Sequence, residues 1–272
     1  MSKKGGQSLK ETLQSAFATS AILIAFIVSF LVYKYIMGDP ANFQGGNPEG
    51  SPIAGNYLAM IYKGGMIVPL LMTCVLVVIT FCFERAIMIR KARGKERVNV
   101  FVKKIQDLLT SNQIEEAKAL CDKQKGSLAN IVRAALNRYR ELQEDTSLEK
   151  DQKVLAIQKE LEEATALELP MLSKNLVILS TLASICVLIG LIGTVLGMIR
   201  AFSALASAGS PDALALATGI SEALINTAFG ISGSTLAIVF FNYFSSKIDA
   251  FTFKMDEASY SVVQTFASTT KR

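Results

Sequence analysis

Residues 189–198 read Ile-Gly-Leu-Ile-Gly-Thr-Val-Leu-Gly-Met, and residues 219–230 read Gly-Ile-Ser-Glu-Ala-Leu-Ile-Asn-Thr-Ala-Phe-Gly. Both stretches lie inside long apolar segments. Residues 175–199 contain no charge, and residues 213–246 contain only one, Glu222. Each segment is long enough to cross a bilayer as a helix, which takes about 20 apolar residues. The sequence therefore predicts two neighbouring membrane spans, and the rest of the chain is interpreted around them.

Glu222 is the main candidate for a functional residue. On insertion scales, Asp, Lys or Arg at the centre of a spanning helix costs roughly 2.5–3.5 kcal/mol, so an ionisable group there usually marks a proton, ion or substrate path. A lone carboxyl in lipid would be neutral, because desolvation disfavours its charged form. Two roles stay open. Glu222 accepts and passes protons when wetted inside an oligomer, or it holds helix or partner contacts and never titrates.

Small residues accompany Glu222 and the first motif. Small side chains at helical spacing allow helix backbones to approach closely in lipid, so a packing role is expected for them. At 100° per residue, Asn226 lies on the same side of its helix as Glu222. The glycines expected to serve packing are Gly190, Gly193, Gly197, Gly219, Gly230 and Gly233. The residues expected to face lipid are Leu214, Leu224, Ile225, Leu236 and Ile238.

Composition excludes several function classes. The 272 residues include no His, which removes His-based metal sites and Ser-His-Asp hydrolysis. The four cysteines are spaced like small apolar residues, so free thiols are expected rather than a zinc site or a disulfide framework. No nucleophile–base set or phosphate-binding loop is present, so an enzyme is the least supported class. Neither a cofactor nor a metal is expected.

The N-terminal third supplies two further candidate spans. An apolar run from Ala16 to Tyr33 follows a basic start and predicts an uncleaved membrane anchor. The run ends without a small-x-small cleavage pattern, which disfavours a signal peptide, and residues 22–32 are apolar all round, which disfavours a surface helix. Residues 38–62 are rich in Pro and Gly and predict a loop or linker. Residues 64–83 carry no charge and predict the second span.

The central region, residues 84–174, is strongly charged. It holds 18 of the 28 Lys and Arg residues and 15 of the 23 Asp and Glu residues. Its basic cluster directly after the apolar block is explained by the positive-inside rule, so no nucleic acid is expected as a partner. The cluster consists of Arg85, Arg90, Lys91, Arg93, Lys95 and Arg97.

Apolar residues in this region recur at helical spacing and predict an intracellular helical bundle. One stripe comprises Val98, Val102, Ile105, Leu108 and Leu109; a second comprises Leu128, Ile131, Val132, Ala135, Leu136 and Tyr139. A long helix is expected to lead into the third span, with a kink at Pro170. The tail after Ser245, with its periodic Phe251, Met255 and Val262, predicts a helix that leaves the membrane and rejoins the bundle.

Lys and Arg counts set the expected topology. Residues 1–15, 84–174 and 245–272 are rich in Lys and Arg, whereas 38–62 and 203–212 have none. Four crossings with both termini in the cytoplasm fit this distribution. The expected fold class is all-α: a polytopic membrane protein whose long helices extend into a cytoplasmic bundle. The expected divisions are 1–63 (anchor and periplasmic linker), 64–83 (span), 84–174 (cytoplasmic region), 175–245 (two-helix pore core) and 246–272 (cytoplasmic C-terminal helix).

Through the patterns in 190–198 and 219–230, the chain resembles the MotA/TolQ/ExbB proton-channel family, and the ExbB/TolQ branch matches best. The resemblance implies a homopentamer around a pore that holds two copies of a single-span ExbD- or TolR-like protein. It also implies work on a TonB- or TolA-like protein, driven by the proton motive force across the bacterial inner membrane and its lipids. Glu222 matches the family's membrane glutamate, and Thr194 and Thr227 match its pore-lining threonines. Asn226, beside Glu222, is added to the expected proton path.

The chain departs from the family pattern in three places. The Ala-Pro usually found before the first glycine motif is replaced by Ile185-Cys186-Val187, and the Pro after the second motif is missing from residues 232–237. Residues 16–33 add a span to the usual three. Within the family, an ExbB-like role in TonB-dependent outer-membrane transport is the first hypothesis and a TolQ-like role in the envelope the second. A solute transporter is the competing class, disfavoured because one Glu in four spans is little intramembrane polarity. A flagellar stator is also disfavoured.

Overall fold

In the computed structural model, the described residues are 18–48, 50–144, 148–206 and 213–269. Within these ranges the chain is helical, and the strand-type pairing is limited to an isolated bridge between Phe43 and Pro52. The expected all-helical class is confirmed. The described residues cluster into two compact units: Met1–Cys82 with Ile178–Phe241, and Phe83–Val177 with Asn242–Arg272.

Four helices are long and apolar enough to cross a membrane: Ala18–Met37, Gly65–Ala92, Lys150–Ala206 and Ala213–Ser268. They correspond to the four spans expected from the sequence. The first ends in the π-helix η1 (Val32–Met37). The second is mostly α3 (Val68–Ala92), preceded by the short 3-10 helix η4 (Gly65–Ile67). The chain is therefore built as a multi-pass membrane protein.

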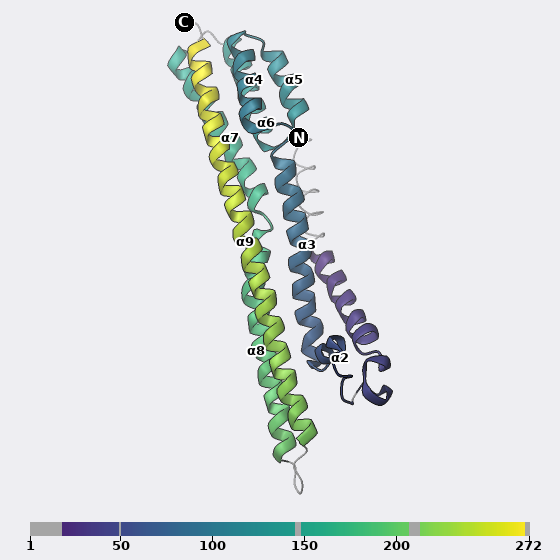
Figure 1. The fold of residues 1–272 in the computed structure, drawn as a ribbon. Helices are drawn as coiled ribbons and strands as arrows, with labels where there is room; N and C mark the ends of the chain where they lie inside the picture. Colours follow the sequence, from purple (N-terminus) through teal and green to yellow (C-terminus); the bar gives the residue numbers. More distant parts are fainter. Residues whose placement is uncertain (1–17, 49, 145–147, 207–212, 270–272) are drawn as a thin grey trace. The chain divides into compact units, whose positions relative to one another are not determined.

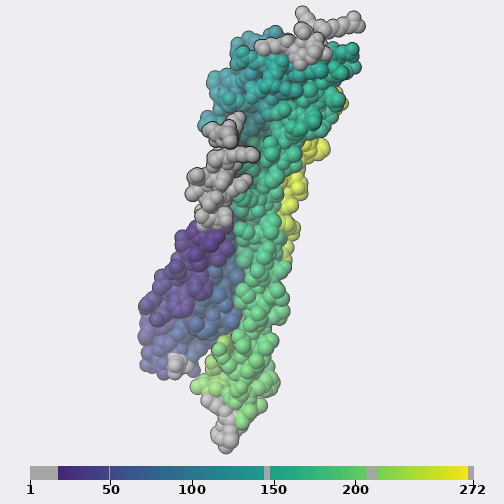
Figure 2. Space-filling model, turned by 180° about the vertical axis from the view of Figure 1, so that it is seen from behind, coloured from purple at the N-terminus to yellow at the C-terminus, as the bar shows by residue number. Residues whose placement is uncertain are grey.

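In the first unit, the N-terminal helix packs on α3, and Figure 2 shows these two segments side by side, in purple and blue. Tyr33 and Met37 form a buried cluster with Val68 of α3. The Tyr33 ring stacks on Tyr62 at a centroid distance of 4.6 Å. The Tyr33 hydroxyl also donates to the Tyr62 carbonyl at 3.2 Å. Aromatic stacking of this kind fixes the first span against the segment that enters the second.

Residues 38–62, expected to be a loop, contain short helices. These are the 3-10 helices η2 (Pro40–Asn42) and η3 (Gln44–Gly46) and the α-helix α2 (Tyr57–Tyr62). Asn56 caps α2, because its side-chain oxygen accepts hydrogen bonds from the N–H groups of Leu58 and Ala59. An Asn N-cap supplies the acceptor that the first helical turn lacks. The segment is an ordered connection between the first two spans.

The last two helices of the first unit run side by side, as Figure 1 shows for α8 (Leu176–Ala206) and α9 (Ala213–Thr269). α8 extends to Ala206, further than the expected start of the turn at 203, and Asp212 lies outside the described residues. α9 continues without interruption through the expected boundary at 245, because no Gly or Pro follows Gly233. Of the residues expected to face lipid, Ile225 is half-buried against Gly64, whereas the other four are exposed.

The second unit contains α4 (Val98–Thr110), α5 (Ile114–Gln124), α6 (Ser127–Glu144), α7 (Lys150–Ser173) and the end of α9. All six residues of the second apolar stripe are buried on α6. The first stripe is partly right, because Val98 and Leu108 are only half-buried and Phe101 is a core residue that it omitted. On the C-terminal part of α9, Phe266 stacks on Tyr139 of α6 at 4.6 Å. The tail is therefore part of this bundle, as expected.

Two details of this unit differ from expectation or add to it. Helix α7 continues through Pro170 and ends at Ser173, before a turn at Lys174 and Asn175. Arg85, assigned to the basic flank, is 1% exposed. Its guanidinium donates to Glu84 and, through Nη1, to the Leu172 carbonyl at 3.0 Å. A buried charge requires such partners, so Arg85 joins α3 to α7.

Candidate functional site

The α8–α9 contact is built from the glycines identified in the sequence. A Cβ added at Gly193 would lie 2.5 Å from the Asn226 Cβ, and one at Gly197 would lie 2.8 Å from the backbone nitrogen of Ala223. Added at the other positions, it would meet backbone or side-chain atoms of the facing helix or of α3. Those positions are Gly190, Gly219, Gly230 and Gly233. At Gly193 and Gly197, only residues without a side chain permit this separation of the two helices.

This close approach of the two helices buries Glu222, which is 4% exposed. Both carboxylate oxygens accept hydrogen bonds from Nη1 of Arg200 on α8, at 2.5 and 2.6 Å. The Glu222 side chain also lies directly against Gly65, where a Cβ would collide with the carboxylate. The sequence predicted a lone carboxyl in this span. In the structure, the carboxyl is instead paired with a cation on the neighbouring helix.

Asn226, one turn after Glu222, is fully buried. Its Nδ2 donates to the Gly64 carbonyl at 2.9 Å, which joins α9 to the entry of α3. Its Oδ1 is buried and has no hydrogen-bond partner within the described part of the chain. Leaving a buried acceptor without a partner costs about 1–3 kcal/mol, and a buried water molecule would remove this cost.

The two threonines that the sequence singled out meet each other. The hydroxyls of Thr194 on α8 and Thr227 on α9 are within hydrogen-bonding distance. Each hydroxyl oxygen also lies 3.1 Å from a carbonyl of its own helix, that of Gly190 for Thr194 and that of Ala223 for Thr227. Because a hydroxyl has a single proton, one threonine donates to the other and the second donates to its carbonyl. A hydroxyl pair of this kind can donate and accept in either direction. Thr227 points to the α8 contact, although it lies 140° from Glu222 around the helix.

An open apolar groove of about 570 Å³ runs along α8 from Thr194 to Ala206. Its lining includes Val195, Ile199 and Phe202, which are all exposed. These residues recur at helical spacing, so they form one stripe of the α8 surface. The groove therefore begins at the threonine pair and follows the helix toward the turn between α8 and α9.

The structure thus brings together Glu222, Asn226 and the threonine pair along one helix contact. It adds Arg200 and the Gly64–Gly65 turn, which the sequence reasoning missed. One signal was available for Arg200: it is the first charge after the first motif, and the loop to α9 is short, so an antiparallel partner near the start of α9 is expected. The four cysteines are buried and free.

Comparison with known proteins gives the same assignment. A sequence model of the MotA/TolQ/ExbB proton channel family matches residues 123–257, which include the whole two-helix site. This part of the chain matches the family. The matched range begins in α5 and ends in the C-terminal part of α9.

Individual relatives come from the ExbB and TolQ branch. The protein named ExbB-like 3 from Synechocystis sp. is 39% identical over 88 residues, which is 32% of this chain and 42% of that protein. TolQ of the Tol-Pal system from Pseudomonas aeruginosa is 30% identical over 117 residues, 43% of this chain and 51% of that protein. The biopolymer transport protein ExbB from Pseudomonas putida is 31% identical over 160 residues, 58% of this chain and 48% of that protein. The chain thus matches about half the length of these relatives, and names of both branches occur among them.

Proposed function

We propose that this chain is a proton-channel subunit of the bacterial inner membrane, with both termini in the cytoplasm. Together with an ExbD-like single-span protein, it converts the proton motive force into mechanical work for TonB-dependent transport across the outer membrane. The observation that carries the proposal is the buried carboxylate of Glu222 inside a spanning helix, paired with Arg200.

The pair gives Glu222 two states that differ in charge. When Glu222 is ionised, Arg200 neutralises it, and the site tolerates the charge within the membrane. When a proton reaches the carboxylate, the Arg200 guanidinium loses its counter-charge and is free to take another one. The Arg200 side chain is 56% exposed, against 5% for Glu222, so the arginine has room to move. Proton arrival thus converts a closed ion pair into an unpaired cation.

The residues next to the pair suit proton movement. The unsatisfied Oδ1 of Asn226 is an acceptor that a water molecule or a hydrated proton would satisfy. The threonine pair lies further along the same helix contact and offers two hydroxyls that both donate and accept. In this proposal Glu222 carries the proton, Arg200 is its counter-ion, and Asn226, Thr194 and Thr227 are the polar residues along the path.

The partner and the oligomer are proposed from the family and from the α8 surface. Five copies around a pore would turn the groove between Thr194 and Ala206 toward a neighbouring helix. A single-span partner supplies a helix of the required apolar character, with a carboxyl that Arg200 can pair with after Glu222 is protonated. Two copies of the partner would sit in the pore. Because relatives of both branches match, a TolQ-like role with TolR- and TolA-like partners is the second candidate.

The test uses the full chain co-expressed with a single-span protein that is encoded by a neighbouring gene. Native mass spectrometry of the extracted complex is expected to give five copies of this chain and two of the partner. Glu222→Gln keeps the shape and removes the charge, so the complex should still form while proton-driven work is lost. If the variant fails to assemble, Glu222 serves assembly and not proton transfer. A monomer that never recruits a partner would contradict the motor and move the transporter hypothesis to first place.

A further inference from the structure

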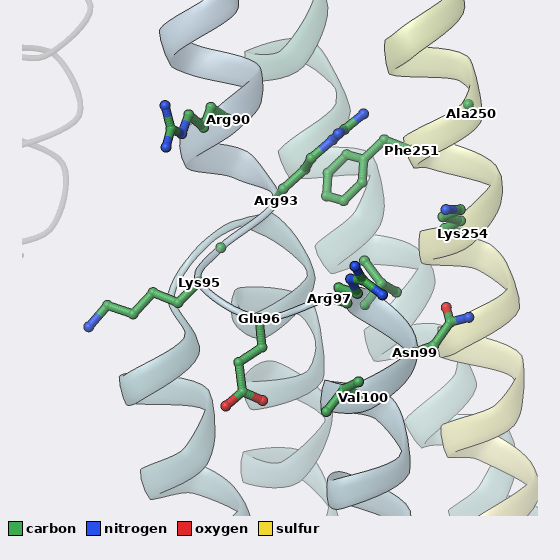
Figure 3. Close-up of a pocket in the computed structure, with 12 residues that line it drawn as sticks. Arg90, Arg93, Lys95, Glu96, Arg97, Asn99, Val100, Ala250, Phe251 and Lys254 are labelled. Atoms are coloured by element: carbon green, nitrogen blue, oxygen red, sulfur yellow. The ribbon is translucent and has the colours of Figure 1, made fainter.

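A pocket of about 610 Å³ lies in the second unit between the α3–α4 loop and the C-terminal part of α9. Arg93 and Arg97 contribute from the loop and Lys254 from α9. Figure 3 shows Arg93 and Arg97 extending toward α9, whereas the side chain of Lys95, which also lines the pocket, extends away from α9. Three cations from two distant parts of the sequence therefore converge on one cavity.

The positive charge of this pocket is not compensated. In the part of the chain that the structure describes, Arg93, Arg97 and Lys254 have no carboxylate partner. Glu96 is the carboxylate residue among those that line the pocket, and both of its oxygens accept from Lys104, at 2.8 and 2.9 Å. Its charge is thus already neutralised. The pocket is left with a net positive charge that an anion would balance.

The loop that carries these cations is held in place by Gln124, which is 5% exposed. The Gln124 side chain accepts from the Glu96 N–H at 2.9 Å and donates to the Glu96 carbonyl at 3.0 Å. The Gln124 carbonyl also accepts from the N–H of Lys95 at 3.1 Å. A loop fixed by three hydrogen bonds presents its arginines in a defined arrangement, which reduces the entropy lost on binding.

Gly94 gives the loop its conformation. Its φ is +76°, and a Cβ there would collide with the Lys125 carbonyl, so no other residue fits without strain. The loop therefore turns back tightly on the end of α5.

The positive-inside rule explains Lys and Arg residues directly after a span, but it places no demand on their geometry. It does not require a cation from α9, a loop pinned by a buried glutamine, or a cavity where these charges meet. A second pocket of about 390 Å³ shares Arg90 and Arg93 and adds Lys247, also from α9. The basic face thus extends along α9 over two helical turns.

We propose that the pocket of Arg93, Arg97 and Lys254 binds a phosphate-bearing anion. Arginine donates to phosphate oxygens through two parallel N–H groups, and Asn99, which also lines the pocket, offers an amide donor. Two sources carry this chemistry: the headgroup of an anionic phospholipid, for which basic pockets beside membrane helices are suited, and a free phosphate compound.

The experiment uses the purified full chain and two probes. The first is dioleoyl phosphatidylglycerol, compared with zwitterionic dioleoyl phosphatidylcholine, with retained lipid counted by native mass spectrometry. The second is inorganic phosphate, compared with chloride at equal ionic strength, with the midpoint of thermal unfolding as readout. We expect preferential retention of phosphatidylglycerol, a rise in the midpoint with phosphate, or both. A lipid-only response identifies a headgroup site, and a phosphate-only response a site for a soluble anion.

The decisive variant is Arg93→Gln combined with Lys254→Gln. It should weaken the affinity for the probe that binds by about 10-fold or more. The reason is that losing one charge-assisted hydrogen bond to phosphate lowers the affinity by about a factor of ten. Lys103→Gln with Lys123→Gln removes the same net charge at exposed positions that do not line the pocket, and it should keep the response. Arg93→Lys with Lys254→Arg should retain most of it. The proposal is wrong if neither probe exceeds its control, or if both double Gln variants weaken the response equally.

Discussion

Glu222 and Arg200 form an ion pair across the α8–α9 contact, with one guanidinium nitrogen 2.5 and 2.6 Å from the two carboxylate oxygens. Arg200 lies six residues before the end of α8 and Glu222 nine residues after the start of α9, which is about two helical turns in each case. The pair therefore belongs to the end of the helix hairpin. Residues on both sides of it yield the following predictions.

The ion pair predicts non-additive stability effects. Arg200→Gln and Glu222→Gln should each lower the free energy of unfolding, because each leaves one charge without its partner. In the double variant, the loss should be smaller than the combined single losses by about 0.5–3 kcal/mol. Unfolding in detergent, followed by circular dichroism, measures this coupling. Arg200→Gln combined with Glu163→Gln, on the distant helix α7, should be additive; coupling as large there would remove the evidence for a specific pair.

Two glycine substitutions on the site helices should lower stability by different amounts. In Gly197→Ala, the new methyl would meet the backbone nitrogen of Ala223 at 2.8 Å, so the helices must separate, at about 1–3 kcal/mol. In Gly233→Ala, the methyl would meet the side chains of Val75 and Cys186 at 3.2 and 3.3 Å. Small side-chain shifts absorb that contact, and the higher helix propensity of Ala offsets it by up to about 1 kcal/mol. Thermal unfolding of the two variants compares them; equal losses would contradict the packing account.

The hydrogen bond from Asn226 to the Gly64 carbonyl predicts a long-range effect. Asn226→Ala should lower the unfolding free energy by about 1–3 kcal/mol, because the buried carbonyl loses its donor. Hydrogen exchange should rise at residues 61–66, although they lie more than 150 positions away in the sequence. Thr235→Ala is the matched control. The Thr235 hydroxyl is exposed and bonds only the Ile231 carbonyl of its own helix, so the change should stay within about 0.5 kcal/mol.

Cys121 on α5 predicts a dependence of stability on pH. Burial, together with the neighbouring Asp122 charge, raises the pKa of the Cys121 thiol from near 9 to about 12. The folded state then binds more protons than the unfolded state between these values. The contribution to stability is complete below about pH 9 and falls as the pH rises toward 12. Cys121→Ala should unfold with a weaker decline between pH 9 and 11 than the parent chain, as followed by denaturant titration. An equal decline in both proteins would contradict the assignment.

The sequence predicted the spans and the bundle because their signals are local. Runs without charge defined four membrane helices, and a 3.6-residue period found all six buried residues of the stripe on α6. Glycine spacing likewise identified the side of α8 that contacts α9. Each of these patterns reflects whether a helix, or one side of it, faces lipid, water or the protein core. That environment is visible in the residue types of the helix itself.

The features that were missed depend on where two helices meet. Arg200 was treated as the end of an uncharged segment, because its pairing with Glu222 depends on the length and path of the turn between the helices. Ile225 was placed toward lipid because helical periodicity does not reveal that Gly64 covers it. The short helices in residues 38–62 escaped notice because Asn caps and 3-10 turns resemble ordinary loop composition.

The Asn226–Gly64 contact has a consequence for biogenesis. Spans are inserted in the order in which they are synthesised. The Gly64–Gly65 turn is therefore in the membrane without its partner Asn226 while more than a hundred residues are still to be translated. Glu222, Arg200 and their glycine neighbour come together only after the final span has entered the bilayer. The carboxylate site is thus completed late, and an unfinished chain does not yet hold the Glu222–Arg200 ion pair.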